Sequence, residues 1–298
     1  MTRWAAAREP GARGPRAIVS PMASFLVVPQ WQGSASTRAM RLVDGADAIR
    51  GDLPSSATIV VEVPAEAGDA QDTGVRRYAS VAMTAERVRE ALAGRSGPVV
   101  TIGGDCGVEF AAIGHAVRTS AEPVALVWLD AHPDASTPET SPSGAFCGMV
   151  LSAVLGRGVG LLSATAADRV ADERVVLAGV RAADPGELEG LLERGAARLD
   201  VDALDPEALV AAVEATGAGS VYVHIDLDVL DPAELAGLFD PVPFGVPASR
   251  LVECLAALRA RFPLAGAGLT SFAPSSPAAA VDDLPTILRL VGALARGV

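Results

Sequence analysis

Paired cysteines, an excess of positive charge and a long apolar run are all missing from the 298-residue sequence. The three cysteines, Cys106, Cys147 and Cys254, are odd in number and widely spaced. Such a pattern excludes a disulfide framework and favours a reducing compartment, here the cytoplasm. The net charge of −12 argues against a nucleic-acid or anionic-membrane partner. No apolar run approaches the roughly 20 residues of a membrane-spanning helix.

Periodicity is missing from the first 22 residues, which are rich in Arg, Gly and Pro. We predict that residues 1–22 are a disordered leader, or reflect an early start codon with Met22 as the true start. Strand and helix patterns alternate through the rest of the chain without an internal repeat. Residues 23–298 are therefore predicted to form a single domain.

Short apolar runs alternate with amphipathic helical patterns. The runs predict strands at residues 24–31, 58–64, 98–105, 123–130, 174–181, 220–228 and 263–272. Their near-continuous apolarity is typical of strands buried on both faces of a parallel sheet. Helices are predicted at residues 81–94, 106–118, 206–217, 248–262 and 285–297. This order predicts an α/β fold with a mainly parallel sheet, helices on both sides, and ligand binding at the carboxyl ends of the strands.

Metal-type ligands gather where two of the predicted strands end. Asp130, His132 and Asp134 occupy alternate positions after one strand, and the same spacing separates Asp226 from Asp228 at the end of another. Side chains two positions apart in a strand point to the same side. Four carboxylates and an imidazole need compensation when buried, which divalent cations provide. The pattern predicts two adjacent ions with shared carboxylates, although either stretch alone is also typical of a solvated loop.

Three segments, GGDCG, DAHPD and HIDLDVLDP, resemble the GGDHS, DAHxD and SxDxDxxDP signatures of the arginase/agmatinase/formiminoglutamase superfamily, the ureohydrolases. The resemblance runs in order from about residue 103 to 274. It implies a three-layer α/β/α sandwich, so that residues 23–298 would be a single arginase-like catalytic domain. It also implies assembly as a homo-oligomer, a trimer or hexamer, and two Mn²⁺ ions.

The resemblance also implies six metal ligands. They are Asp130 and Asp226 bridging both ions, Asp134 and Cys106 on the first ion, and His132 and Asp228 on the second. The ions would activate a water molecule for attack on a guanidinium carbon. Asp134 would be the catalytic residue that passes a proton to the leaving nitrogen.

Cys106 stands where the GGDHS signature has histidine. Thiolate suits Zn²⁺ or Fe²⁺ better than Mn²⁺, so these two metals stay open beside Mn²⁺. We expect Cys106 to begin a helix, where the pKa of a thiol is lowered. It binds metal, lies near the metal without a bond, or marks a degenerate site. A branch of the superfamily that acts on N-hydroxyarginine resembles this chain in having cysteine here.

The stretch DAHPDASTPETSPSGAFCG is similar, without a gap, to the arginase stretch DAHxDxNTPxTxxSGNxHG. The resemblance places Cys147 at the catalytic position of the arginase proton-shuttle histidine, with core packing as the alternative. Ser136 and Ser143 match positions that bind the α-carboxylate of the substrate. Ala145 lacks a polar contact that the family has there.

Two further segments carry expected substrate contacts. GVRAADPGE resembles the arginase segment GLRDVDPGE, which places Asp184 at the α-amino group of the substrate and Glu187 close by. An Asp-Pro-Gly turn with a helix cap is the alternative. The glutamate that holds the guanidinium in the family falls on Ser271. An N-hydroxyguanidine is less basic than a guanidine, and its nitrogen is expected to leave more easily, so the changes at Ser271 and Cys147 favour it over a guanidine.

The other two histidines have plainer interpretations. His224 precedes Asp226 by two positions, and we expect either a packed, satisfied side chain or one that orients a metal ligand. His115 is expected at the surface.

The sequence therefore predicts a binuclear-metal hydrolase that cleaves a C–N bond of a linear guanidino or hydroxyguanidino amino acid. Arginine or Nω-hydroxy-L-arginine would give urea or hydroxyurea plus ornithine. The alternatives are an agmatinase- or formiminoglutamase-like amidine hydrolase and a non-catalytic protein with the same fold.

Overall fold

One sheet of eight strands organises the molecule. The computed structural model describes residues 23–295, so the predicted leader at residues 1–22 lies outside it. The strand order is β2-β1-β3-β8-β7-β4-β5-β6, and every pairing of neighbours is parallel. The strands are β1 (Ser24–Val28), β2 (Thr58–Val60), β3 (Val99–Gly103), β4 (Val124–Leu129), β5 (Val175–Ala178), β6 (Ala197–Leu199), β7 (Ser220–Asp226) and β8 (Leu264–Thr270).

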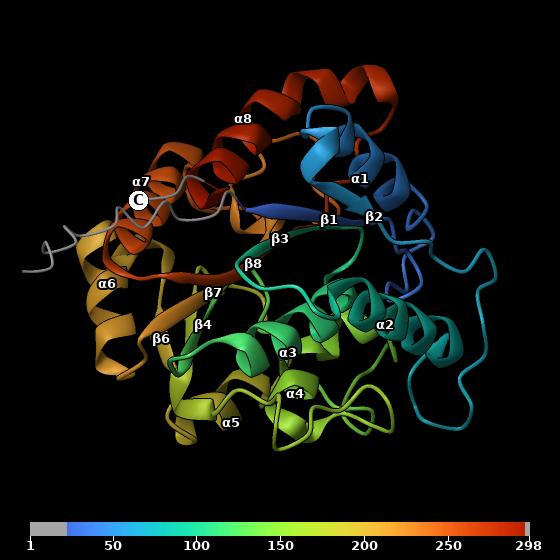
Figure 1. Cartoon of the computed structure of the whole chain (residues 1–298), viewed down its shortest axis with the longest axis horizontal. Helices are drawn as coiled ribbons and strands as arrows, with labels where there is room; N and C mark the ends of the chain where they lie inside the picture. The colour runs from blue at the N-terminus through green and yellow to red at the C-terminus, as the bar shows by residue number, and fades with distance from the viewer. Residues whose placement is uncertain (1–22, 296–298) are drawn as a thin grey trace, which may run out of the picture.

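Helices cover both faces of the sheet and make three layers (Figure 1). One face packs against α1 (Arg41–Gly51), α6 (Pro206–Ala215), α7 (Ala248–Arg261) and α8 (Pro277–Ala295). The other packs against α2 (Tyr78–Leu92), α3 (Glu109–Thr119), α4 (Val150–Ser152) and α5 (Glu187–Glu193). Each interface is a separate apolar cluster, so both faces of the central strands are buried. The α/β sandwich is confirmed, and its sheet is parallel throughout.

All seven predicted strands are present, each shorter than its apolar run. The eighth strand, β6, was not predicted because its three residues at the sheet edge include Arg198 and have no fully buried position. The helices α1 and α5 were also not predicted. The helix expected to start at Pro285 begins at Pro277 and carries Pro285 inside it. No helix within residues 23–295 is long and apolar enough to cross a membrane.

Four central strands bring the unusual residues to one edge of the sheet. Leu129 of β4 pairs with Ile225 of β7, so that Asp130 and Asp226 follow at the same level. Strand β7 pairs on its other side with β8, and there Asp226 pairs with Thr270. Because parallel strands end at the same edge, the fold itself assembles residues that lie about 100 positions apart.

Candidate active site and metal centre

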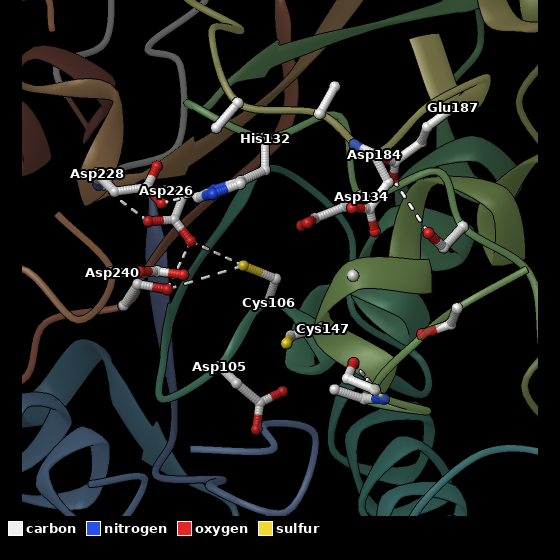
Figure 2. A pocket seen from close by; sticks show the side chains of 18 of the residues that line it. Asp105, Cys106, His132, Asp134, Cys147, Asp184, Glu187, Asp226, Asp228 and Asp240 are labelled. Carbon is white, nitrogen blue, oxygen red and sulfur yellow. Dashed lines mark hydrogen bonds and ion pairs between the residues drawn. The ribbon is translucent and has the colours of Figure 1, made fainter. Parts of the chain in front are cut away.

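A cavity of about 490 Å³ lies at the carboxyl ends of these strands. Of the twelve predicted site residues, eleven line it, and Asp130 is buried behind them. The lining carries seven carboxylates, from Asp105, Asp134, Asp184, Glu187, Asp226, Asp228 and Asp240 (Figure 2). His132 is the one group in this lining that can carry positive charge. Such a cavity selects cationic occupants.

The segment after β4 turns its ligand-type residues inward by hydrogen bonds rather than by strand alternation. The strand ends at Leu129, and the N–H of His132 donates to Asp130 Oδ1 at 2.6 Å. His132 Nδ1 lies 2.9 Å from Asp228 Oδ2. Asp134 has a left-handed backbone (φ 48°), which ends any extended geometry. The predicted convergence is present, although its local cause differs from the one expected.

The end of β7 is held by four backbone and side-chain donors. Asp226 Oδ1 accepts from the N–H of Asp228 at 2.9 Å. Asp226 Oδ2 accepts from Ser271 Oγ at 2.5 Å and from Cys106 Sγ at 2.9 Å. Asp228 Oδ1 accepts from the N–H of Ala131 at 3.0 Å, which joins β7 to β4. The two aspartates are therefore fixed by their own surroundings.

Cys106 reaches the cavity from the turn after β3. Gly104 permits the turn, because a Cβ atom there would lie 1.7 Å from the carbonyl oxygen of Gln30. Cys106 begins a three-residue 3₁₀ turn instead of a full helical turn. Burial, followed by the negative charges of Asp226 and Asp134, raises the pKa of its thiol well above the usual value. The expectation that a helix start lowers this pKa was therefore wrong for the metal-free protein, since burial and like charge outweigh the dipole.

Cys147 also lines the cavity. Its pKa is raised well above the usual value, first by burial and then by the charge of Asp134. The thiol is half-buried and packs against the same apolar cluster as α2 and α3. Both interpretations given for Cys147 are thus compatible with its position.

Two groups of ligand atoms, each within 4.8 Å of one another, lie beside the cavity. The first consists of Cys106, Asp130, Asp134 and His224, and the second of Asp130, His132 and Asp228. Asp130 belongs to both. Asp226, which was predicted to bridge both ions, belongs to neither group. Asp134 Oδ2 is buried and has no hydrogen-bond partner among the described residues.

The carboxylates of this centre compete for charge. Burial, then the charge of Asp130, raises the pKa of Asp226 to about 6, and the same causes raise the pKa of Asp134 well above its usual value. Burial and the charges of Asp226 and Asp130 raise the pKa of Asp228. Although burial acts against it, hydrogen bonds from His132 and His224 lower the pKa of Asp130. Asp130 is shared by the two ligand groups, and Asp134 Oδ2 has no hydrogen-bond partner among the described residues. The raised pKa values mean that these carboxyl groups hold protons, which bound cations would displace. These features fit two divalent ions.

The residues predicted to contact substrate lie in the lining of the cavity. Glu187 Oε1 accepts from the N–H of Ala135 at 2.8 Å, and its Oε2 accepts from the N–H of Asp184 at 3.1 Å. Ser136 Oγ lies 3.4 Å from Glu187 Oε1. Glu187 thus ties the loop after β4 to the loop before α5, while the Asp184 side chain is exposed. The Ser143 hydroxyl accepts from the N–H of Ala145 at 3.1 Å.

Several residues of the site were not predicted. Asp240, Ser141 and Phe239 line the rim, and no spacing or motif in the sequence marks them. Glu109, at the start of α3, contacts His224 below the cavity. The sequence signal that could have identified Glu109 is its charge, because it lies within a predicted apolar helix three positions after Cys106. His115 was expected at the surface but is 8% exposed, because it lies in the buried part of α3 that runs from Glu109 to Ala116.

Comparison with known proteins finds related sequences and the same fold. The arginase of Bacillus caldovelox is 28% identical over 225 residues, which cover 72% of this chain and 75% of that protein. The arginase of Bacillus subtilis is 32% identical over 171 residues, 54% of this chain and 56% of that protein. The crystal structure of Entamoeba histolytica arginase with L-ornithine superposes with a TM-score of 0.81 at 19% identity, covering 94% of this chain and 99% of that one.

The sequence model described as the Arginase family matches residues 3–281, which is most of the chain and includes every site residue named above. The signatures, the parallel sheet and the carboxylate-rich centre all agree with that match. The chain therefore belongs to the arginase family and is a metal-dependent hydrolase of the ureohydrolase type.

Proposed function

We propose that this hydrolase cleaves the C–N bond of a linear guanidino amino acid, and that Nω-hydroxy-L-arginine is preferred over L-arginine. The products would be hydroxyurea or urea, with ornithine. The observation that carries the proposal is the pair of ligand groups sharing Asp130 beneath a cavity lined by carboxylates. A cationic head at the metal centre and an amino group at the rim both match this charge.

The metal requirement is proposed as two divalent ions, Mn²⁺ first, with Zn²⁺ or Fe²⁺ open because of Cys106. The predicted holders are Cys106, Asp130, His132, Asp134, Asp226 and Asp228. When bound, the ions supply a polarised water as nucleophile at neutral pH.

The protein's own groups would do the rest. As water adds to the guanidine carbon, its proton must reach the nitrogen that leaves as the C–N bond breaks. Asp134 lines the cavity, and its Oδ2 has no hydrogen-bond partner among the described residues. Asp134 is therefore the proposed carrier of that proton. Asp184, Ser136 and Ser143 would orient the amino-acid head group, with Glu187 holding their loops in place.

The preference for a hydroxyguanidine rests on Ser271. Ser271 points its hydroxyl at Asp226 and offers no carboxylate to a full guanidinium cation. Cys147 is half-buried, and the raised pKa of its thiol makes it a poor acid–base shuttle near neutral pH. A hydroxyguanidine is less basic than a guanidine, so it depends less on the missing carboxylate. The leaving nitrogen is the δ nitrogen of ornithine with either substrate, so Cys147 does not discriminate between them.

Product release from a substrate panel tests the proposal. The purified chain, loaded with Mn²⁺, would be assayed with L-arginine, Nω-hydroxy-L-arginine, agmatine and formiminoglutamate at equal concentrations. We expect the highest kcat/KM with Nω-hydroxy-L-arginine. Turnover of L-arginine that equals or exceeds it would contradict the substrate proposal.

Two alternatives are favoured by single observations. The exposed position of Asp184 leaves room for an agmatinase- or formiminoglutamase-like substrate without an α-amino group. Replacement of histidine by Cys106 and Cys147 favours a non-catalytic protein. Failure to bind Mn²⁺ would support the second alternative.

We further propose a homo-oligomer, a trimer or hexamer, with residues 23–298 as one catalytic domain acting in the cytoplasm.

A further inference from the structure

His224 occupies a built position beneath the metal centre. It lies in β7 with no solvent exposure, and its ring stacks on Trp128 of β4 with centroids 3.6 Å apart and planes 20° apart. Its Nδ1 lies 2.7 Å from Glu109 Oε1. Strand pairing, ring stacking and this hydrogen bond together fix the ring, so its second nitrogen has one direction to point.

That second nitrogen, Nε2, points at the metal ligands. It lies 3.4 Å from Asp130 Oδ2, longer than an ordinary hydrogen bond. His224 belongs to the group of ligand atoms that also includes Cys106, Asp130 and Asp134, all within 4.8 Å of one another. Ligands about 2.1 Å from an ion and at right angles to each other lie roughly 3 Å apart. This contact is a long hydrogen bond, and its spacing also suits two ligands of one ion.

Glu109 is the partner that such a ligand requires. Imidazoles that bind metal commonly donate their other N–H to a carboxylate, which fixes the tautomer and raises the basicity of the ligand nitrogen. Glu109 is fully buried at the start of α3, and its Oε2 has no hydrogen-bond partner among the described residues. Gly268 of β8 makes the space, because a Cβ atom there would lie 1.8 Å from Glu109 Cδ.

We propose that His224 Nε2 is a direct ligand of the ion on the Cys106 side, with Glu109 as its positioning residue. The chain lacks imidazole at position 106, where the GGDHS signature has it, and has imidazole at position 224, where SxDxDxxDP has serine. An imidazole from the neighbouring strand thus restores a nitrogen donor beside the thiol, which suits Mn²⁺ better than thiolate alone. This inference rests on the proposed metal-dependent function and adds a seventh ligand to it.

Metal binding tests the proposal without recourse to activity. Metal-free protein would be dialysed against graded Mn²⁺, and bound metal measured by elemental analysis. His224→Asn keeps an N–H for Glu109 but removes the ligand nitrogen. We expect wild type to bind two ions, and the variant to keep one ion while its affinity for the other falls at least about 100-fold. His115→Asn, which removes a buried imidazole away from the cavity, is the matched control and should bind both ions as wild type does.

Spectroscopy identifies which ion is affected. In Co²⁺-loaded protein, a thiolate-to-cobalt band reports the ion on the Cys106 side. We expect His224→Asn to change this band, while His115→Asn leaves it as in wild type.

A second variant guards against misfolding. Glu109→Gln keeps an acceptor for Nδ1–H and removes the charge, so we expect about 10- to 100-fold weaker binding of the same ion. Unchanged binding of both ions by His224→Asn and Glu109→Gln would overturn the ligand assignment and leave the proposed hydrolase intact. Wild-type protein that binds none of Mn²⁺, Zn²⁺ and Fe²⁺ would overturn both.

Discussion

His132 Nδ1 lies 2.9 Å from Asp228 Oδ2, and this contact joins the ends of two neighbouring strands. The backbone repeats the connection, because the N–H of Ala131 donates to the other oxygen of Asp228 at 3.0 Å. The second ligand group is therefore held together by the sheet before any ion arrives. A preformed site of this kind loses little conformational entropy on binding metal.

The sharing of Asp130 predicts unequal effects of two similar substitutions. Asp130→Asn removes a charge common to both ligand groups, whereas Asp228→Asn removes a charge from one. We expect bound Mn²⁺ to fall from about two ions per chain to near zero in the first variant and to about one in the second, as measured by elemental analysis after desalting.

Asp240→Asn is the control for this comparison, because Asp240 lines the cavity but belongs to neither ligand group. It should keep both ions. Equal losses in Asp130→Asn and Asp228→Asn would contradict a shared carboxylate.

The exposed carboxylate of Asp184 should act on substrate affinity alone. Its N–H is held by Glu187, which leaves the carboxylate free at the rim. Loss of one charge-assisted contact with an α-amino group costs about 1.5 to 3 kcal/mol, or roughly 10- to 100-fold. We expect Asp184→Ala to raise KM for Nω-hydroxy-L-arginine by this factor, with little change in kcat.

Glu189→Ala removes a neighbouring exposed carboxylate of α5 that does not line the cavity, and it should leave KM unchanged. An unchanged KM in Asp184→Ala would show that the head group is bound elsewhere or absent, as with agmatine.

Buried Asp105 should make the metal-free protein more stable in mild acid. Burial raises its pKa to about 6, despite hydrogen bonds from Gln30 and Gly107. Its folded pKa lies above the unfolded value, so the penalty is full at pH 7.5 and is relieved as the pH falls through about 6. A shift of about two units corresponds to about 3 kcal/mol.

The measurement is urea unfolding in EDTA at pH 7.5 and pH 5.5. We expect a higher free energy of unfolding at the lower pH, and a smaller pH effect after Mn²⁺ loading, because the added positive charge favours the ionised form. Asp105→Asn should reduce the pH effect in EDTA. A metal-free protein that is less stable at pH 5.5 than at pH 7.5 would contradict this account.

Sequence patterns predicted the strands and the convergence of ligands because both depend on local periodicity. Apolar runs located seven of the eight strands, and parallel pairing then placed Asp130 beside Asp226. The edge strand β6 was missed because three residues with a central Arg198 carry no periodic signal.

Contacts between elements far apart in the chain could not be predicted from sequence patterns. Glu109 and His224 are 115 positions apart, and their meeting depends on how α3 lies on the sheet and on the space left by Gly268. The pKa of Cys106 was misjudged for a similar reason. The position in the chain suggested a helix dipole, while the tertiary structure adds burial and three nearby carboxylates.

Cys106 itself offers the most direct test of metal choice. Its Sγ lies 2.9 Å from Asp226 Oδ2 and 3.4 Å from Thr270 Oγ1. Cys106 also belongs to the first ligand group. Cys106→His would replace a soft donor by imidazole, so we expect the affinity for Mn²⁺ relative to Zn²⁺ to rise by about tenfold or more in competition dialysis. Cys106→Ser, which nearly keeps the volume, should lower the affinity for Zn²⁺ most. Cys254→Ser changes a buried thiol of α7 outside the site and should alter neither affinity. A Mn²⁺/Zn²⁺ preference that stays the same in all three variants would mean that the thiol lies beside the ions without binding them, and that carboxylates and imidazoles alone select the metal.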